Sequence, residues 1–251
     1  MRAAGLLDPA ALVDVKRLGE LRGLARTDGG FAIGSATTLD TLASWSEPAP
    51  SAVIDGARLV GAVQTRTRAT IGGNVCRSSP AGDMLCGLLV HEAEAELASL
   101  GGSRRVPLAD FFLGPGRNVR RSDELLTRLH VPRLAGGSAY ARFTYRRWMD
   151  LAVVGVAARV AFGSDGRCVD AAVAVGAAGP TPFLVPEAAA ALRSSSCDGE
   201  AASAAADAVV AAAEPIDDVR GTRRHRLRVL RSLARRVIET AAARAREAGE
   251  R

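Results

Sequence analysis

Two adjacent glycines, Gly72 and Gly73, constrain the fold of this chain more than any other feature. They stand in residues 68–74, which read Arg-Ala-Thr-Ile-Gly-Gly-Asn. Glycine tolerates positive φ and lets backbone amides come close to a ligand. Successive amides in such a turn form an anion-binding concavity that suits a pyrophosphate, with the short polar side chains of Thr70 and Asn74 at its ends. An ordinary turn explains the same two glycines, so the pattern alone leaves both interpretations open.

Asp83 follows the glycines and precedes an apolar stretch, residues 86–90, that predicts a helix. An acid at this position is common for capping reasons alone. Together with the glycine turn, however, residues 69–83 resemble the second flavin-contacting motif of the FAD-binding subunits of molybdenum hydroxylases. This family includes the medium subunit of carbon monoxide dehydrogenase and the flavin domain of xanthine dehydrogenase. Its pattern is an Ala-Thr-Ile-Gly-Gly-Asn turn followed by a Ser/Asp-Pro-x-x-Asp segment that opens a helix, and both are present here at the expected spacing.

Five further segments carry the same resemblance in the family's order along the chain. They are residues 9–23, 33–39, 111–127, 140–154 and 217–226. The resemblance therefore extends over nearly all 251 residues. Two positions depart from the pattern: Arg142 stands where relatives usually carry a flavin-contacting Lys, and His225 replaces a usual Tyr. Arginine keeps the charge at position 142, but a guanidinium donates in a different geometry from an ammonium.

The family also has a first FAD-binding loop, of Ala-Gly-Gly-Thr-Asp-Leu type. This chain begins roughly where the segment after that loop would lie. We therefore expect either a start codon upstream of Met1 or the loss of half of the diphosphate clamp. Loss of several charge-assisted hydrogen bonds, each worth about 1.5–3 kcal/mol, would lower the affinity for FAD by orders of magnitude.

The resemblance implies an α+β fold in two domains. The first, residues 1–134, would be an FAD-binding domain of the PCMH/vanillyl-alcohol-oxidase type, truncated at its N-terminus. The second, residues 138–244, would be an antiparallel sheet covered by helices, of the type found at the C-terminus of carbon monoxide dehydrogenase flavoproteins. FAD is the implied cofactor, and it would lie in the crevice between the domains. The implied FAD-binding residues are Thr70, Ile71, Gly72, Gly73, Asn74, Asp83, Leu126 and Arg142.

The implied role is electron relay within a molybdenum-dependent dehydrogenase. In relatives a small subunit with two [2Fe–2S] clusters and a molybdopterin-binding large subunit supply the electrons, and the flavin passes them to an external acceptor. In relatives the loop that corresponds to residues 146–150 lies by the isoalloxazine ring, so Arg146 and Asp150 would tune its potential. Trp148 would either stack on the flavin or pack elsewhere. The competing hypotheses are a remnant that kept the fold as a binding subunit but lost flavin, and a basic nucleic-acid-associated protein.

Composition indicates a globular protein and excludes some other classes. Hydrophobic residues make up 48% of the chain, yet there is no run of about twenty apolar residues and no signal-peptide core, so we expect a cytoplasmic protein without a membrane span. The four cysteines are scattered and the three histidines dispersed, so we expect neither a metal centre nor a catalytic triad. The net charge of +6 comes from Arg, since Lys16 is the only lysine, and it does not require nucleic-acid binding.

Periodicity and turn signals predict the elements. We expect a strand at 12–15, a hairpin turning at residues 28–30, helices at 38–45 and 50–63, a polar loop at 64–68, strands at 93–100 and 105–108, a helix at 108–113, strands at 152–162 and 169–177, two helices within 186–214, and a final amphipathic helix from about 227. Glu94 and Glu96 share one strand face. A solvated face explains this pair better than a metal or acid–base site.

Overall fold

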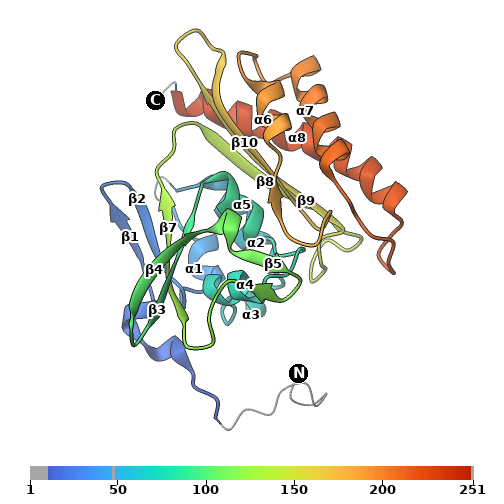
Figure 1. Cartoon of the computed structure of the whole chain (residues 1–251). Coiled ribbons are helices and arrows are strands. Elements are labelled where there is room, and N and C mark those ends of the chain that lie inside the picture. The colour runs from blue at the N-terminus through green and yellow to red at the C-terminus, as the bar shows by residue number, and fades with distance from the viewer. Residues whose placement is uncertain (1–10, 47–48, 250–251) are drawn as a thin grey trace.

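The computed structural model describes residues 11–46 and 49–249, which form two antiparallel sheets with helices between and outside them (Figure 1). Residues 1–10, where the predicted first domain and the family segment at Pro9 begin, lie outside the described residues. The two sheets and their helices confirm the predicted α+β class. Within the described ranges, no helix is long and apolar enough to cross a membrane.

The first sheet has the strand order β1-β2-β7-β3-β4 and is antiparallel throughout. Its strands are β1 (Leu24–Thr27), β2 (Gly30–Gly34), β3 (Glu94–Ser99), β4 (Gly102–Pro107) and β7 (Leu125–Pro132). Its helices are α1 (Leu39–Ala43), α2 (Ser51–Leu59), α3 (Val63–Arg66), α4 (Ile71–Arg77) and α5 (Leu85–Val90). Three short 3-10 helices, η2 (Val15–Arg17), η3 (Gly19–Leu21) and η4 (Leu108–Asp110), and a small ribbon of β5 (Phe112–Gly114) and β6 (Arg117–Asn118) complete this part.

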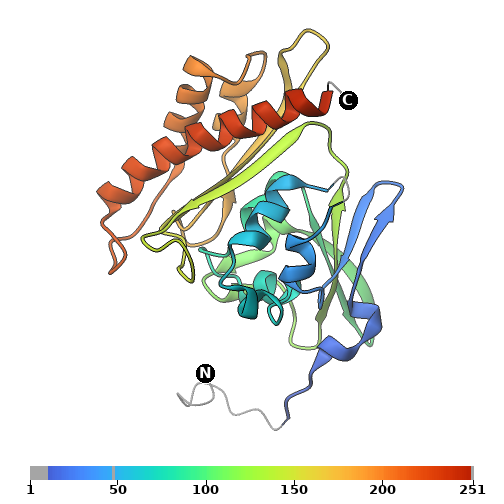
Figure 2. The same ribbon diagram turned by 180° about the vertical axis from the view of Figure 1, so that it is seen from behind.

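The second sheet has the order β11-β10-β9-β8. Its strands are β8 (Gly137–Phe143), β9 (Val154–Phe162), β10 (Cys168–Gly176) and β11 (Phe183–Leu184). The helices α6 (Pro186–Leu192), α7 (Gly199–Ala212) and α8 (Arg223–Gly249) follow. Figure 2 shows α8 running along the length of this sheet. Leu230, Leu233, Val237 and Ile238 of α8 are buried on the sheet side, as the amphipathic pattern predicts.

The two sheets share an apolar junction, because α2 and α5 lie between them and contact the second sheet (Figure 1). One buried cation also joins the two parts. The Arg159 side chain, on β9, is almost fully buried, and its Nε donates to the Val90 carbonyl at 2.9 Å. Its Nη1 donates to Asp170 at 2.8 Å, so the charge is paired at the edge of the junction.

Several local predictions are wrong for identifiable reasons. The predicted strand at 12–15 is absent: residues 11–14 are irregular and η2 follows, begun by the Asp14 side chain, which accepts from the Lys16 amide. Residues 108–113 form η4 and then β5 rather than one helix, and the predicted loop at 64–68 contains α3. Most importantly, Gly72 and Gly73 do not have positive φ but lie in the first turn of α4.

Candidate functional site

The glycine pair opens a helix because Thr70 caps it. The Thr70 hydroxyl accepts a hydrogen bond from the Gly73 amide at 3.1 Å, which satisfies one of the free amides of the first turn. Gly72 is needed for close packing rather than for a turn. Its amide donates to the Ser35 carbonyl at 2.8 Å, and a Cβ at position 72 would lie only 2.7 Å from that oxygen. The segment is therefore held against the loop that leaves β2.

Further backbone bonds fix the same contact. The Ile71 amide donates to Thr37 at 3.1 Å, and the Leu39 amide donates to Ala69 at 2.9 Å. The Ser35 amide in turn donates to Thr127 of β7 at 2.9 Å. These backbone bonds join three segments into one unit, namely residues 35–39, residues 69–72 and β7. Each segment belongs to the family pattern, but the sequence did not show that residues 35–39 contact the glycine pair.

Gly73 and Asn74 offer the features that an approaching ligand needs. Gly73 is exposed, and a Cβ there would meet only the Thr70 hydroxyl, at 3.1 Å. The Asn74 Oδ1 atom is buried and has no hydrogen-bond partner within the part of the chain that the structure describes. Buried polar atoms are normally satisfied, so an orphan beside an open glycine is consistent with a group that binds there. The predicted concavity of free amides is not formed, because the amides of residues 71–74 donate to Thr37, Ser35 and Thr70. What this segment offers a ligand is the open surface at Gly73 and the Asn74 oxygen.

Asp83 and Arg142 come together, but their charged groups bind each other. Arg142 Nη1 donates to Asp83 Oδ2 at 2.5 Å, and the Tyr140 hydroxyl donates to Asp83 Oδ1 at 2.8 Å. The Arg142 side chain is only 3% exposed. Burial raises the pKa of Asp83 to about 6, and the adjacent guanidinium and the two hydrogen bonds oppose that shift. Tyr140, to which the sequence assigned no role, completes this buried cluster.

The cluster is connected to the glycine segment through the end of α2. Arg142 Nη2 donates to the Leu59 carbonyl at 2.8 Å. From there the chain passes through α3, whose Arg66 Nη1 donates back to the Val60 carbonyl at 3.4 Å, and then reaches Thr70. Asn74 and Arg142 share no hydrogen bond in residues 11–46 and 49–249. Seven of the eight predicted site residues therefore fall in two groups, residues 70–74 and the Asp83 cluster, and the eighth, Leu126, lies in the core.

Leu126 is nearly fully buried on β7 and belongs to the same apolar core as Ile71. Its side chain is a core side chain, so only its backbone is open to a polar role. The Glu96 carboxylate accepts from the Thr127 hydroxyl at 3.1 Å and pairs with the His130 Nε2 atom at 2.7 Å. These bonds stabilise the sheet surface. No group of three or more His, Cys, Asp or Glu side chains that would hold a metal ion occurs among the described residues.

The loop between β8 and β9 presents aromatic side chains that the sequence left undecided. Trp148 is 53% exposed and lies under the Arg147 guanidinium at 5.4 Å, so it is not packed in the core. Tyr145 stacks on His225, with ring centroids 6.2 Å apart and an interplanar angle of 11°. The residue that departs from the family's Tyr thus keeps an aromatic contact between this loop and the start of α8.

The two parts of the chain each match a known protein family. The FAD binding domain in molybdopterin dehydrogenase matches residues 1–134, and the CO dehydrogenase flavoprotein C-terminal domain matches residues 138–241. The xanthine dehydrogenase FAD-binding subunit of Escherichia coli O157:H7 is 30% identical over 92% of this chain and 81% of its own length. The carbon monoxide dehydrogenase medium chain of Hydrogenophaga pseudoflava is 30% identical over 94% of this chain and 83% of its own length. Among solved structures, reconstituted CO dehydrogenase from Oligotropha carboxidovorans superposes with a TM-score of 0.86 at 28% identity, covering 90% of this chain and 80% of that chain.

Proposed function

This chain belongs to the family of FAD-binding subunits of molybdopterin dehydrogenases, and we propose that it binds FAD and relays electrons within a multi-subunit molybdenum hydroxylase. The family's named members are subunits of oxidoreductases. Beyond family membership, the observation that supports the proposal is the buried Asn74 Oδ1 without a partner among the described residues, beside the open backbone of Gly73.

In this proposal residues 70–74 hold the diphosphate-bearing half of FAD. Gly73 lets the ligand approach the backbone, and the Asn74 Oδ1 atom accepts a hydrogen bond from a hydroxyl or amino group of the ligand rather than from the diphosphate. Leu126 contributes through its backbone, since its side chain lies in the core. Asp83 and Arg142 do not contact FAD in this proposal. Their ion pair and the Arg142 bond to Leu59 hold β8 against the end of α2, and so set the position of the two proposed domains, 1–134 and 138–244, on either side of the crevice.

Bound FAD would supply the redox chemistry, and the protein would position it and set its electronics. The proposed partners are a small subunit with [2Fe–2S] clusters and a molybdopterin-binding large subunit, with an external electron acceptor. The exposed loop at 144–151, held by the Tyr145–His225 stack, would cover one side of the crevice and exclude water from it.

The test compares Gly73→Asp with Gly73→Asn in purified protein. Both side chains fill the same space near Thr70, but only Asp adds a negative charge. An acid in the first turn of a helix does not destabilise the helix, so loss of flavin from Gly73→Asp is a binding effect. We expect the visible absorption of oxidised flavin in the parent protein, a smaller loss in Gly73→Asn, and near-complete loss in Gly73→Asp.

Flavin content that is equal in the parent protein and in Gly73→Asp would contradict the proposal. If neither protein retains or takes up added FAD, a binding subunit without flavin is the better description. Copurification with iron–sulfur and molybdenum subunits, when they are coexpressed, tests the proposed partners separately.

A further inference from the structure

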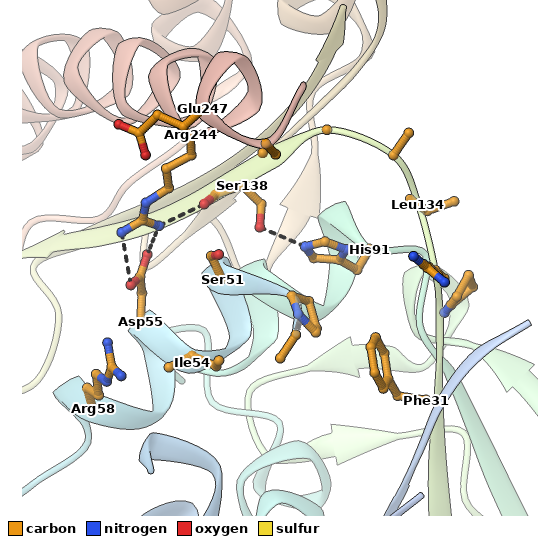
Figure 3. A pocket seen from close by; sticks show the side chains of 18 residues that line it. Phe31, Ser51, Ile54, Asp55, Arg58, His91, Leu134, Ser138, Arg244 and Glu247 are labelled. Atoms are coloured by element: carbon orange, nitrogen blue, oxygen red, sulfur yellow. Dashed lines mark hydrogen bonds and ion pairs between the residues drawn. The ribbon is translucent and has the colours of Figure 1, made fainter. Parts of the chain in front are cut away.

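A cavity opens at the junction of the two sheets, and neither residues 70–74 nor the Asp83 cluster lines it (Figure 3). Its volume is about 790 Å³, within the range of small-molecule sites. Five segments that are distant in sequence line it: Phe31 of β2, residues 49–58 at the start of α2, His91 after α5, residues 132–138, and the end of α8. None of the eight predicted FAD-binding residues is among its lining residues.

The walls of the cavity are preformed. Residues 132–138 connect β7 to β8, and two glycines hold this connection against its neighbours. Gly136 has φ +98°, and a Cβ there would lie 2.0 Å from the Val160 carbonyl oxygen. A Cβ on Gly137 would lie 2.2 Å from the Ala245 amide of α8. These close backbone contacts fix the position of the connection, so this wall of the cavity is formed before a ligand binds.

The floor of the cavity is polar and neutral. Ser138 and His91 are both buried, and their Oγ and Nε2 atoms lie 2.9 Å apart. The Ser138 hydroxyl also accepts from the Ala52 amide at 3.0 Å, so its own proton is free to donate to Nε2. Burial lowers the pKa of His91 to about 3, which keeps the imidazole uncharged at neutral pH. This floor binds polar atoms without adding a charge.

The sides of the cavity carry an excess of cations. Arg244 donates to Asp55 at 2.6 Å and to the Ser138 carbonyl at 2.7 Å, so its charge is already neutralised (Figure 3). Arg58 and Arg133 also line the cavity, and neither forms an ion pair with a carboxylate of the residues that the structure describes. Glu247, which also lines the cavity, is exposed near Arg244. Arg58 donates to the Ala43 carbonyl at 3.0 Å and lies at the Asp55 end of the cavity, so Arg133, next to Leu134 in the chain, is the cation available to an anion at the other end (Figure 3).

Apolar side chains complete the lining, namely Phe31, Ile54, Pro132 and Leu134. Phe31 and Leu134 lie on the side of His91 that faces away from the Asp55–Arg244 pair (Figure 3). We propose that this cavity is a binding site for a small organic anion, one whose carboxylate or phosphate is held by Arg133 and whose apolar ring packs against Phe31 and Leu134. This site is independent of the proposed flavin site.

The test uses phenyl phosphate as the probe and benzyl alcohol as a neutral ring of similar size, titrated calorimetrically into the purified protein saturated with FAD. We expect saturable binding of phenyl phosphate at one site and much weaker binding of benzyl alcohol. Arg133→Gln should weaken phenyl phosphate binding by about tenfold, as expected for loss of one charge-assisted hydrogen bond. Arg193→Gln, which removes an exposed arginine at the end of α6 that does not line the cavity, is the matched control and should leave binding unchanged.

Leu134→Trp offers a second variant that fills the cavity without changing charge, and it should abolish binding. The proposal is overturned if phenyl phosphate does not saturate, if benzyl alcohol binds equally well, or if Arg193→Gln weakens binding as much as Arg133→Gln does. Displacement of FAD by the probe would also overturn it, because the anion would then occupy the flavin site. Flavin absorbance, recorded in parallel, reports on the proposed function separately, so the two proposals can fail independently.

Discussion

Asp83→Asn should change how the stability of this protein depends on pH. The Asp83 carboxyl is buried beside Tyr140 and Arg142, and its pKa is raised from 3.8 to about 6 by that burial. A carboxyl with a raised pKa binds its proton more tightly in the folded chain than in the unfolded chain. The stability that it contributes is therefore fully present below the unfolded pKa and is lost as pH rises through the folded value.

The magnitude follows from the shift of about two pKa units. Each unit corresponds to about 1.4 kcal/mol, so the wild-type protein should lose about 3 kcal/mol of unfolding free energy, relative to Asp83→Asn, between about pH 3.5 and pH 7. Asparagine cannot ionise. Its one amide oxygen can accept from Arg142, and the Tyr140 hydroxyl can then accept from the amide nitrogen. The variant therefore lacks this pH-dependent loss while retaining the shape of the cluster.

The assay is urea unfolding of both proteins at several pH values across this range, with flavin content matched because a bound ligand stabilises the folded state. Asp110→Asn, at an exposed carboxyl on η4, is the control and should parallel the wild type. The reasoning is refuted if the wild type gains stability over Asp83→Asn as pH rises. That result would mean that the attraction between Asp83 and Arg142 outweighs the cost of burying the carboxylate.

Three further predictions concern neighbouring features. Gly72→Ala should lower the unfolding free energy by about 1–2 kcal/mol, because overpacking against the Ser35 carbonyl exceeds the gain in helix propensity. Gly73→Ala should be neutral or stabilising by up to about 1 kcal/mol. Thermal unfolding of both variants checks this, and equal changes in melting temperature would contradict it. Ser138→Ala should destabilise by about 2 kcal/mol or more in urea, because it leaves the Ala52 amide and the His91 ring without their buried partner. Glu124→Gln should flatten the dependence of melting temperature on pH at acid pH. Hydrogen bonds from Arg104 lower the Glu124 pKa from 4.5 to about 2, so the stability that Glu124 contributes above pH 4.5 is lost as the pH falls towards 2. A variant whose melting temperature depends on acid pH as the wild type's does would argue against this.

Local signals in the sequence predicted much of the fold. The Asp28-Gly29 turn and the buried strand after it were visible because the turn residues and the apolar run are adjacent. The cap at Thr38 and the apolar face of α8 were visible for the same reason. The errors lie where a local pattern suits two structures. Gly72-Gly73 suits a turn or the first turn of a helix, and the choice depends on Ser35, which lies far away in sequence.

The candidate site was predictable only as a set of segments. The resemblance to the family selected residues 70–74, Asp83 and Arg142, but nothing in the spacing shows that residues 59 apart form a buried ion pair. The same holds for Tyr140, whose hydroxyl completes the pair. The cavity beside His91 was not predictable at all, because five distant segments form it. Such contacts are set by packing between the sheets rather than by local propensity.

The ion pair also limits how the proposed FAD can be held. The Arg142 guanidinium already pairs with Asp83 and donates to the Leu59 carbonyl, so its charge is not free to neutralise a diphosphate. The amides of residues 71–74 already donate to Thr37, Ser35 and Thr70, so the diphosphate would be bound through its close approach to the exposed Gly73 backbone rather than through free amides. This contact involves no charged side chain, so affinity should depend on geometry at Gly73 more than on ionic strength. Placing a negative charge at Gly73 should therefore lower the flavin content of the purified protein more than replacing Arg142 with a neutral residue does, provided that both variants remain folded.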